Sequence, residues 1–352
     1  MTRPRRRRAL TGALALSLTL VLAACGTTAD PQAAGTAVQQ DAAAQGATDQ
    51  STDEQQSTAV GTVSITDAQD RTVEVPVDPG TVVVTDWSVI RTLSDLGIQV
   101  DAVPAPISGL PDDLQPYAGE DVPKVGDVFE PDYEAIEGMS PDVVIVGSRS
   151  GTPEVVAEFE KFATVVDLSV RAEDPADVIP QTRERVEQLG QIFAVEDEAT
   201  SLMDDLEAQI AELEAKISAS GDTAMVVQVS DGTVSAYGPG SRFGMVYENF
   251  GYVPTEAPLQ EGGGHGDEIS QEFFVQYDPD VLFVLDRAKA IGDDEQTPAL
   301  DVLNNGLANT TTAVQDGRVV EVDGFAWYLA TSAPSSIQQM IDDVRASLPD
   351  AR

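Results

Sequence analysis

The sequence contains very few of the residues that build metal sites and disulfides. Among its 352 residues there is one cysteine, Cys25, and one histidine, His265. A single cysteine leaves the chain without an internal disulfide, and a single histidine excludes a zinc or manganese site made of several imidazoles. The chain also lacks a Walker phosphate loop, a G-x-S-x-G elbow and an H-E-x-x-H motif. It therefore carries none of these common catalytic signatures.

Positive charge is also scarce. Twenty lysines and arginines stand against 60 acidic residues, which gives a formal net charge of −40. Loss of residues 1–24, which contain five arginines and no acidic residue, would leave about −45. Nucleic acid and anionic membrane surfaces would repel such a protein, so we expect neither as a partner. Any local cluster of arginines is correspondingly more informative here.

The first 24 residues have the pattern of a secretory signal. A basic start is followed by an apolar stretch over residues 9–24, which is shorter than the ~20 residues of a membrane span. The stretch ends in Leu22-Ala23-Ala24-Cys25, which resembles a bacterial lipobox. The resemblance implies cleavage before Cys25 and lipidation of that residue. A plain secretory signal followed by an unmodified cysteine is the alternative.

Residues 25–59 are expected to form the lipidated cysteine and a disordered tether. Residues 26–59 contain no aromatic residue, lysine or arginine, so they bury too little apolar surface to offset the entropy of ordering. A flexible coil of this length reaches roughly 30 Å. We therefore expect an extracytoplasmic domain held at the outer face of the cell membrane by the lipid anchor alone.

One helix–strand unit occurs twice in the remaining sequence. A proline ends each helix, a run of four apolar residues predicts a buried parallel strand, and an arginine follows the strand. Open α/β sheets bind ligands at the carboxyl ends of their strands, where these arginines would lie. The two copies match at a constant spacing of 138 residues: Glu134, Pro141-Asp142, 143–146 and Arg149, then Glu272, Pro279-Asp280, 281–284 and Arg287.

These patterns predict an α/β fold with two Rossmann-like lobes joined by a long α-helix. Residues 60–173 would form the N-terminal lobe, which opens with a hairpin over residues 61–77. Residues 174–195 would form the interlobe helix, capped by Asp174. Residues 196–352 would form the C-terminal lobe.

Three segments of the second lobe contain candidate ligand-binding residues. The glycine-rich run 235–244 includes Arg242 and precedes a helix expected from about Phe243, an arrangement that favours an anion but also suits a plain connection. His265 lies among glycines, either exposed without a role or available as one nitrogen ligand for iron. Tyr328 follows the strand 319–322, either packed in the core or available as a phenolate ligand for ferric iron.

Together these segments resemble one family. The run Tyr237–Gly244, the His265-Gly266 turn, Asp286-Arg287 and Trp327-Tyr328-Leu329 are similar to the catecholate siderophore-binding lipoproteins of bacterial iron ABC importers. The most similar subgroup binds petrobactin and linear enterobactin-type fragments. The resemblance spans roughly residues 60–345. It implies a class III periplasmic-binding-protein fold, no enzymatic activity, and a ferric siderophore as transported ligand rather than intrinsic cofactor.

The resemblance also assigns roles to individual residues of a monomeric protein. An arginine trio receives the anionic ligand, two residues complete the iron shell, and two outer glutamates dock onto the permease: Arg149, Arg242 and Arg287, then His265 and Tyr328, then Glu134 and Glu272. Asp267 stands where relatives usually carry an amide, so its carboxylate either points away from the ligand or weakens binding.

Three other functions remain open from the sequence. A haem-binding lipoprotein of the same fold could use His265 and Tyr328 as axial ligands, although three arginines exceed what two propionates need. A hydrolase built around His265 lacks any supporting motif. A purely structural surface lipoprotein would bind no iron.

Overall fold

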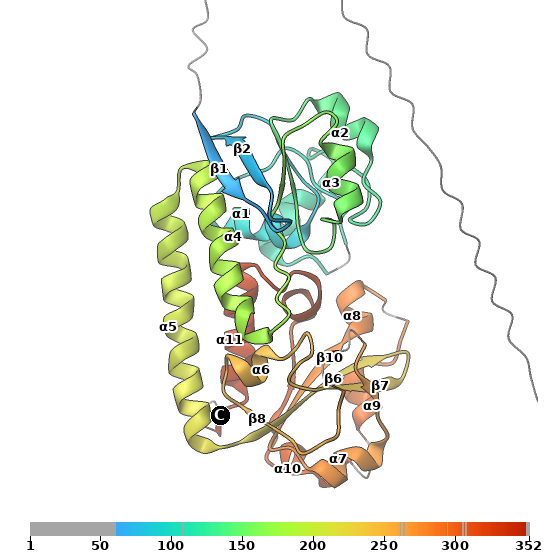
Figure 1. Ribbon diagram of the computed structural model, residues 1–352. Coiled ribbons are helices and arrows are strands. Elements are labelled where there is room, and N and C mark those ends of the chain that lie inside the picture. The colour runs from blue at the N-terminus through green and yellow to red at the C-terminus, as the bar shows by residue number, and fades with distance from the viewer. Residues whose placement is uncertain are drawn as a thin grey trace, which may run out of the picture. The chain divides into compact units, whose positions relative to one another are not determined.

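The computed structural model describes residues 61–349, apart from 108, 261, 263, 264, 294, 305 and 307. The predicted signal segment 1–24, Cys25 and the tether lie outside the described residues. The predicted fold class is confirmed: two α/β lobes, each with its own sheet, belong to one compact unit and are joined by a long helix (Figure 1). Among the described residues, no helix combines the length and the apolar character needed to cross a membrane.

The first lobe is built on a parallel sheet with the strand order β3-β4-β5. Its strands are β3 (Val82–Val84), β4 (Val143–Val146) and β5 (Val165–Asp167), and all their residues are buried. Burial on both faces explains why their sequences are apolar apart from Asp167 at the end of β5. The predicted hairpin is also confirmed, as the antiparallel pair β1 (Thr62–Thr66) and β2 (Thr72–Pro76). The helical segments of this lobe are α1 (Trp87–Asp95), η1 (Asp112–Ala118), α2 (Tyr133–Met139) and α3 (Pro153–Phe159).

The second lobe contains a mixed sheet with the order β11-β10-β6-β7-β9, and β8 pairs with β6. Its strands are β6 (Thr223–Ser230), β7 (Thr233–Tyr237), β8 (Val253–Pro254), β9 (Asp267–Glu268), β10 (Val281–Asp286) and β11 (Val319–Glu321). Its helical segments are α6 (Met245–Glu248), α7 (Gln271–Tyr277), α8 (Arg287–Ile291), α9 (Ala299–Leu303), η3 (Ala308–Thr310), α10 (Thr312–Gln315) and the π-helical turn η4 (Phe325–Leu329). The helix expected from about Phe243 is only the single turn α6.

The repeated sequence unit forms equivalent structures in the two lobes. Helices α2 and α7 begin 138 residues apart, as do the strands β4 and β10 that follow them. The aspartate after each proline anchors the neighbouring parallel strand: Oδ2 of Asp142 accepts from the N–H of Thr81 at 2.8 Å, and Oδ2 of Asp280 accepts from the N–H of Thr223 at 2.8 Å. The Pro-Asp pair therefore ends a helix and sets strand pairing in both lobes.

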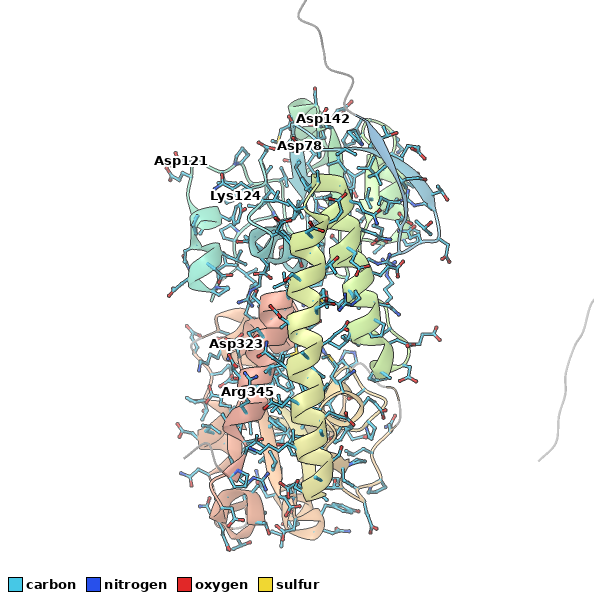
Figure 2. All side chains as sticks on the ribbon, turned by 90° about the vertical axis from the view of Figure 1, so that its left-hand side faces the viewer. Asp78, Asp121, Lys124, Asp142, Asp323 and Arg345 are labelled. Atoms are coloured by element: carbon cyan, nitrogen blue, oxygen red, sulfur yellow. The ribbon has the colours of Figure 1, made fainter. Side chains whose placement is uncertain are left out.

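Long helices run between the lobes. The turn η2 (Pro175–Asp177) leads into α4 (Val178–Phe193), and the side chain of Asp174 caps η2 by accepting from the N–H of Ala176. Helix α5 (Glu196–Ser220) returns beside α4 and ends at Gly221, whose φ of 68° suits glycine (Figure 1). Helix α11 (Pro334–Ala346) packs on α5, where Arg345 of α11 donates to Gln209 at 2.7 Å (Figure 2).

Candidate ligand-binding site

Arg149 is positioned by a buried carboxylate at the end of β3. The backbone N–H of Arg149 donates to Oδ2 of Asp86 at 2.8 Å, and Oδ1 of Asp86 caps α1 by accepting from the N–H of Ser88 at 2.8 Å. Burial raises the pKa of Asp86, while these two amides and the charge of Arg149 oppose that rise. A Cβ on Gly147 would lie 2.5 Å from Cγ of Asp86, so only glycine permits this approach.

Arg242 and Arg287 follow two different strands of the second sheet, β7 and β10, which lie on either side of β6. Arg242 lies in the tight loop after β7, where a Cβ on Gly244 would lie 2.0 Å from the carbonyl oxygen of Pro239. Arg287 is the first residue of α8 and follows β10 directly. Asp286 caps α8 by accepting from the N–H of Lys289 at 3.0 Å. The backbone at both arginines is therefore held in a defined conformation.

All three arginines converge on Tyr328. Nη1 of Arg149 and Nη2 of Arg242 donate to the backbone carbonyl oxygen of Tyr328 at 3.3 and 3.0 Å. Nε of Arg287 donates to the phenolic oxygen of the same residue at 3.1 Å. The guanidinium carbons of Arg149, Arg242 and Arg287 lie 5.9, 4.6 and 5.8 Å from the centre of the Tyr328 ring, within the range of cation–π attraction. Tyr328 thus connects arginines of both lobes.

An unusual backbone turn presents Tyr328. The N–H of Ala330 donates to the carbonyl oxygen of Phe325 at 2.8 Å, a π-helical hydrogen bond of the kind found at functional sites. The neighbouring Trp327 is buried, stacks on Phe283 with ring centres 5.8 Å apart, and donates from Nε1 to Asp343 at 2.7 Å. Trp327 anchors the turn in the core while Tyr328 remains half-buried among the arginines.

The three arginines differ from the other arginines of the described residues in their charge partners. Within the described residues, none of the three forms an ion pair with a carboxylate. Their other contacts are uncharged: Arg287 donates from Nη1 to the Ser230 hydroxyl at 3.5 Å, and the guanidinium of Arg242 lies 5.3 Å from the centre of the Phe243 ring. The side chain of Arg242 is exposed at the edge of the cluster. Partial loss of water around its guanidinium lowers the pKa of Arg242, and the charge of Arg149 lowers it further. In a chain this acidic, three adjacent cations without carboxylate partners form a local positive cluster that would attract an anion. The arginines that do form ion pairs are Arg71, Arg91, Arg171, Arg183, Arg185, Arg318 and Arg345.

His265 is not brought into this cluster. Its side chain is exposed, and no hydrogen bond joins it to the arginines or Tyr328 within the described part of the chain. The following residue, Gly266, approaches the ring of Tyr237 so closely that a Cβ would lie 2.8 Å from it. The carboxylate of Asp267 accepts from N and Nε2 of Gln260, both at 2.7 Å. Both carboxylate oxygens of Asp267 are therefore hydrogen-bonded to Gln260.

The two outer glutamates occupy equivalent exposed positions. Glu134 lies in the first turn of α2, and Glu272 lies in the first turn of α7. A hydrogen bond from the Ser270 hydroxyl holds the pKa of Glu272 below its usual value. Neither residue contacts the arginine cluster. Within the described residues, no group of three or more His, Cys, Asp or Glu side chains could hold a metal ion.

Two residues of the site were missed by the sequence analysis. Asp86 follows the buried strand 82–84, and this position at the carboxyl end of a strand was the available signal. Phe129 is 62% exposed, and its ring centre lies 5.2 Å from the guanidinium carbon of Arg149. Its only sequence signal is an aromatic residue inside the turn-forming segment 126–131.

Direct contacts between the lobes lie beside the site, where α1 meets the start of α11. The hydroxyls of Ser88 and Ser332 are 2.8 Å apart, and Nη1 of Arg91 donates to the Ser336 hydroxyl at 2.9 Å. Oδ2 of Asp95 accepts from the N–H of Ser335 at 2.9 Å. This interface sets the relative position of Arg149 and Tyr328.

Comparison with known proteins supplies relatives over most of the chain. A family model described as periplasmic binding protein matches residues 82–324. The petrobactin-binding protein YclQ of Bacillus subtilis is 31% identical over 275 residues, 78% of this chain and 84% of YclQ. The ferric-anguibactin-binding protein FatB of Vibrio anguillarum is 29% identical over 260 residues, 70% of this chain and 77% of FatB. The crystal structure of the periplasmic catecholate-siderophore binding protein VctP of Vibrio cholerae has a TM-score of 0.74 and 30% identity, covering 81% of this chain and 100% of VctP.

Proposed function

The chain belongs to the periplasmic binding protein family, and we propose that it captures an anionic ferric siderophore of the catecholate type between its lobes. It is a substrate-binding protein of an iron importer and not an enzyme. The ferric siderophore is its transported ligand and not a resident cofactor. The petrobactin, anguibactin and catecholate ligands named for its relatives support this proposal.

The observation that carries the proposal is the convergence of three arginines without carboxylate partners on Tyr328. Two catecholates bound to ferric iron form a net anion, and they leave coordination positions of the iron open. The guanidiniums pair with the catecholate oxygens through charge-assisted hydrogen bonds, each worth roughly 1.5–3 kcal/mol. The planar fork of arginine suits these paired oxygens better than the point charge of lysine.

Tyr328 and His265 fill the open positions on iron in this proposal. The phenolic oxygen of Tyr328 already lies within the arginine cluster. The exposed imidazole of His265 supplies the second position in this proposal, once the ligand is bound. Haem is the weaker alternative, because the relatives named bind siderophores and two propionates need fewer cations than three.

The location and the partners form part of the same proposal. Cleavage before Cys25 and lipidation of this residue anchor a monomeric protein to the outer face of the cell membrane. Lobes over residues 60–173 and 196–352, linked through 174–195, close on the ligand. Glu134 and Glu272, one on each lobe, then dock onto the permease of an ABC importer.

The test is a titration of the chain lacking residues 1–24 with Cys25→Ser. The ligands are a tetradentate ferric bis-catecholate, a hexadentate ferric tris-catecholate and haemin. Trp327 lies next to Tyr328, so fluorescence quenching reports binding, and visible spectra report coordination. We expect the bis-catecholate to bind tightest, with a spectral shift that is lost in the variant combining His265→Ala and Tyr328→Phe. Binding of haemin alone, with a Soret shift, would contradict the proposal and leave the fold unchanged.

A further inference from the structure

Phe129 has the largest exposed fraction among the large apolar side chains of the described residues. It is 62% exposed, followed by Val253 at 44% and Val275 at 43%, and it belongs to none of the hydrophobic clusters. Its neighbour Val128 is 7% exposed and packs in the core. The ring of Phe129 therefore contributes little to the stability of the core. An exposed apolar side chain of this size at the edge of a site suggests a role in binding.

The turn that carries Phe129 is tightly fixed. The N–H of Phe129 donates to Oδ1 of Asp127 at 2.9 Å, and the N–H of Asp127 donates to the carbonyl oxygen of Glu130 at 3.0 Å. Gly126 has a φ of 90°, and a Cβ there would lie 2.5 Å from the carbonyl oxygen of Glu130. Because the turn closes only with glycine and is held by its own hydrogen bonds, it holds the backbone of Phe129 at the edge of the site.

Phe129 borders the arginine cluster from the first lobe. The guanidinium of Arg149 lies 5.2 Å from the centre of the Phe129 ring and 5.9 Å from the centre of the Tyr328 ring. Arg149 therefore contacts an aromatic ring from each lobe. A flat aryl ligand whose oxygens reach Arg149 would bring its ring next to Phe129, where ring–ring contact is worth about 0.5–1.5 kcal/mol beyond area burial.

We propose that Phe129 stacks on an aryl ring of the bound ligand and thereby selects ferric catecholates over ferric complexes of aliphatic carboxylates. This inference rests on the proposed function and deepens it. The arginines attract either kind of anion, because their attraction depends on charge alone. Phe129 favours a ligand with an aromatic ring, which a carboxylate complex such as ferric citrate lacks.

The experiment compares Phe129→Leu and Phe129→Tyr with Val275→Ala, a change at another exposed apolar side chain. Dissociation constants are measured for a ferric bis-catecholate and for ferric citrate at low and high sodium chloride. Phe129→Leu should weaken bis-catecholate binding about three- to tenfold and leave the affinity for ferric citrate unaltered. Phe129→Tyr should retain most of the affinity, and Val275→Ala all of it.

The salt series separates stacking on the ligand from an effect through Arg149. Stacking predicts a loss in Phe129→Leu that is the same at low and high salt, whereas loss of a guanidinium contact is screened by salt. The inference is wrong if Phe129→Leu binds the bis-catecholate like the unaltered protein, weakens both ligands equally, or shows a loss that shrinks with salt. In those cases binding by the unaltered protein still supports the proposed function. If the unaltered protein binds no ferric catecholate, both fail.

Discussion

Arg287 and Tyr328 are joined by a hydrogen bond of 3.1 Å from Nε of the arginine to the phenolic oxygen of the tyrosine. The same tyrosine offers its backbone carbonyl oxygen to arginines of both lobes. Side chain and backbone of Tyr328 therefore have separable tasks. The carbonyl contacts hold the arginines together and do not depend on the side chain, whereas the phenolic oxygen is the group of Tyr328 that we propose binds iron.

Replacement of Tyr328 by phenylalanine tests that separation. We expect Tyr328→Phe to lose the visible phenolate-to-iron absorption of the ferric bis-catecholate complex. Affinity should fall by about 10-fold or more, because the variant loses the phenolate ligand of iron and also the acceptor of the Arg287 hydrogen bond, which by itself is worth roughly 1.5–3 kcal/mol. Tyr277→Phe, in which a half-buried tyrosine of α7 outside the cluster is changed, should keep both spectrum and affinity. An unaltered spectrum in Tyr328→Phe would rule out the phenolate as an iron ligand.

Single arginine-to-glutamine changes test the anion site. Arg149→Gln, Arg242→Gln and Arg287→Gln should each weaken ligand binding by roughly 10- to 100-fold at low salt, and by less at high salt. Each change also relieves repulsion among like charges, so the ligand-free protein should unfold at an equal or slightly higher temperature. Arg345→Gln is the matched control. Arg345 lies outside the site and forms an ion pair with Asp342, with Nη1 and Oδ1 2.8 Å apart. Equal losses in Arg345→Gln would point to a nonspecific charge effect.

The interlobe contact of Asp95 predicts a pH dependence of stability. Burial raises the pKa of Asp95 to about 6, although the N–H of Ser335 and the charge of Arg91 oppose that rise and Asp113 adds to it. In the unfolded chain an aspartate has a pKa of about 3.9. The folded state therefore binds this proton more tightly, and the stabilising contribution is complete below about pH 4. It is lost as the pH rises through about 6.

Asp95→Asn removes this titration and keeps an acceptor for Ser335. Relative to the unaltered protein, its free energy of unfolding should increase between about pH 4 and pH 7, by at most roughly 2–3 kcal/mol. Urea unfolding at three pH values measures this difference. Asp121→Asn, at an exposed aspartate (Figure 2), should show no such trend. A constant difference between Asp95→Asn and the unaltered protein across this range would show that Asp95 is ionised equally in both states.

The parts of the fold with local signals could be predicted from the sequence. The Pro-Asp pairs, the buried apolar runs and the cap at Asp174 act within a few residues, so the repeated helix–strand units and the start of the interlobe helix were predictable. The positions of Arg149 and Arg287 after strands followed from the same periodicity. Their convergence on the carbonyl or hydroxyl of Tyr328 was not predictable, because it depends on a π-helical turn and on lobe contacts made by residues far apart in the chain.

Phe129 and Asp86 show the same limit. Nothing local distinguishes an exposed phenylalanine in a turn from a buried one, and the contact of the Phe129 ring with Arg149 forms only when the chain folds. The capping role of Asp86 was locally readable, but its hydrogen bond to Arg149 spans 63 residues. His265 illustrates the converse, because a motif-based resemblance assigned it a role that no contact among the described residues supports.

The outer glutamates give a prediction that separates ligand capture from delivery. Glu134 and Glu272 are exposed in equivalent first turns of α2 and α7, away from the arginine cluster. The double variant Glu134→Ala with Glu272→Ala should bind the ferric siderophore like the unaltered protein and unfold at the same temperature. Uptake of iron from the same siderophore should fall at least tenfold in cells. The variant lacks the exposed carboxylates that, in the proposed docking, face basic residues of the permease.

A matched control removes acidic residues that lie elsewhere on each lobe. Asp121→Ala with Glu295→Ala deletes the same total charge from exposed positions outside α2 and α7, so it separates a local docking contact from a general loss of negative charge. Normal uptake in the control with reduced uptake in the glutamate variant would support docking through Glu134 and Glu272. Equal reductions in both would indicate long-range electrostatic steering, and normal uptake in both would mean that the permease recognises a different surface.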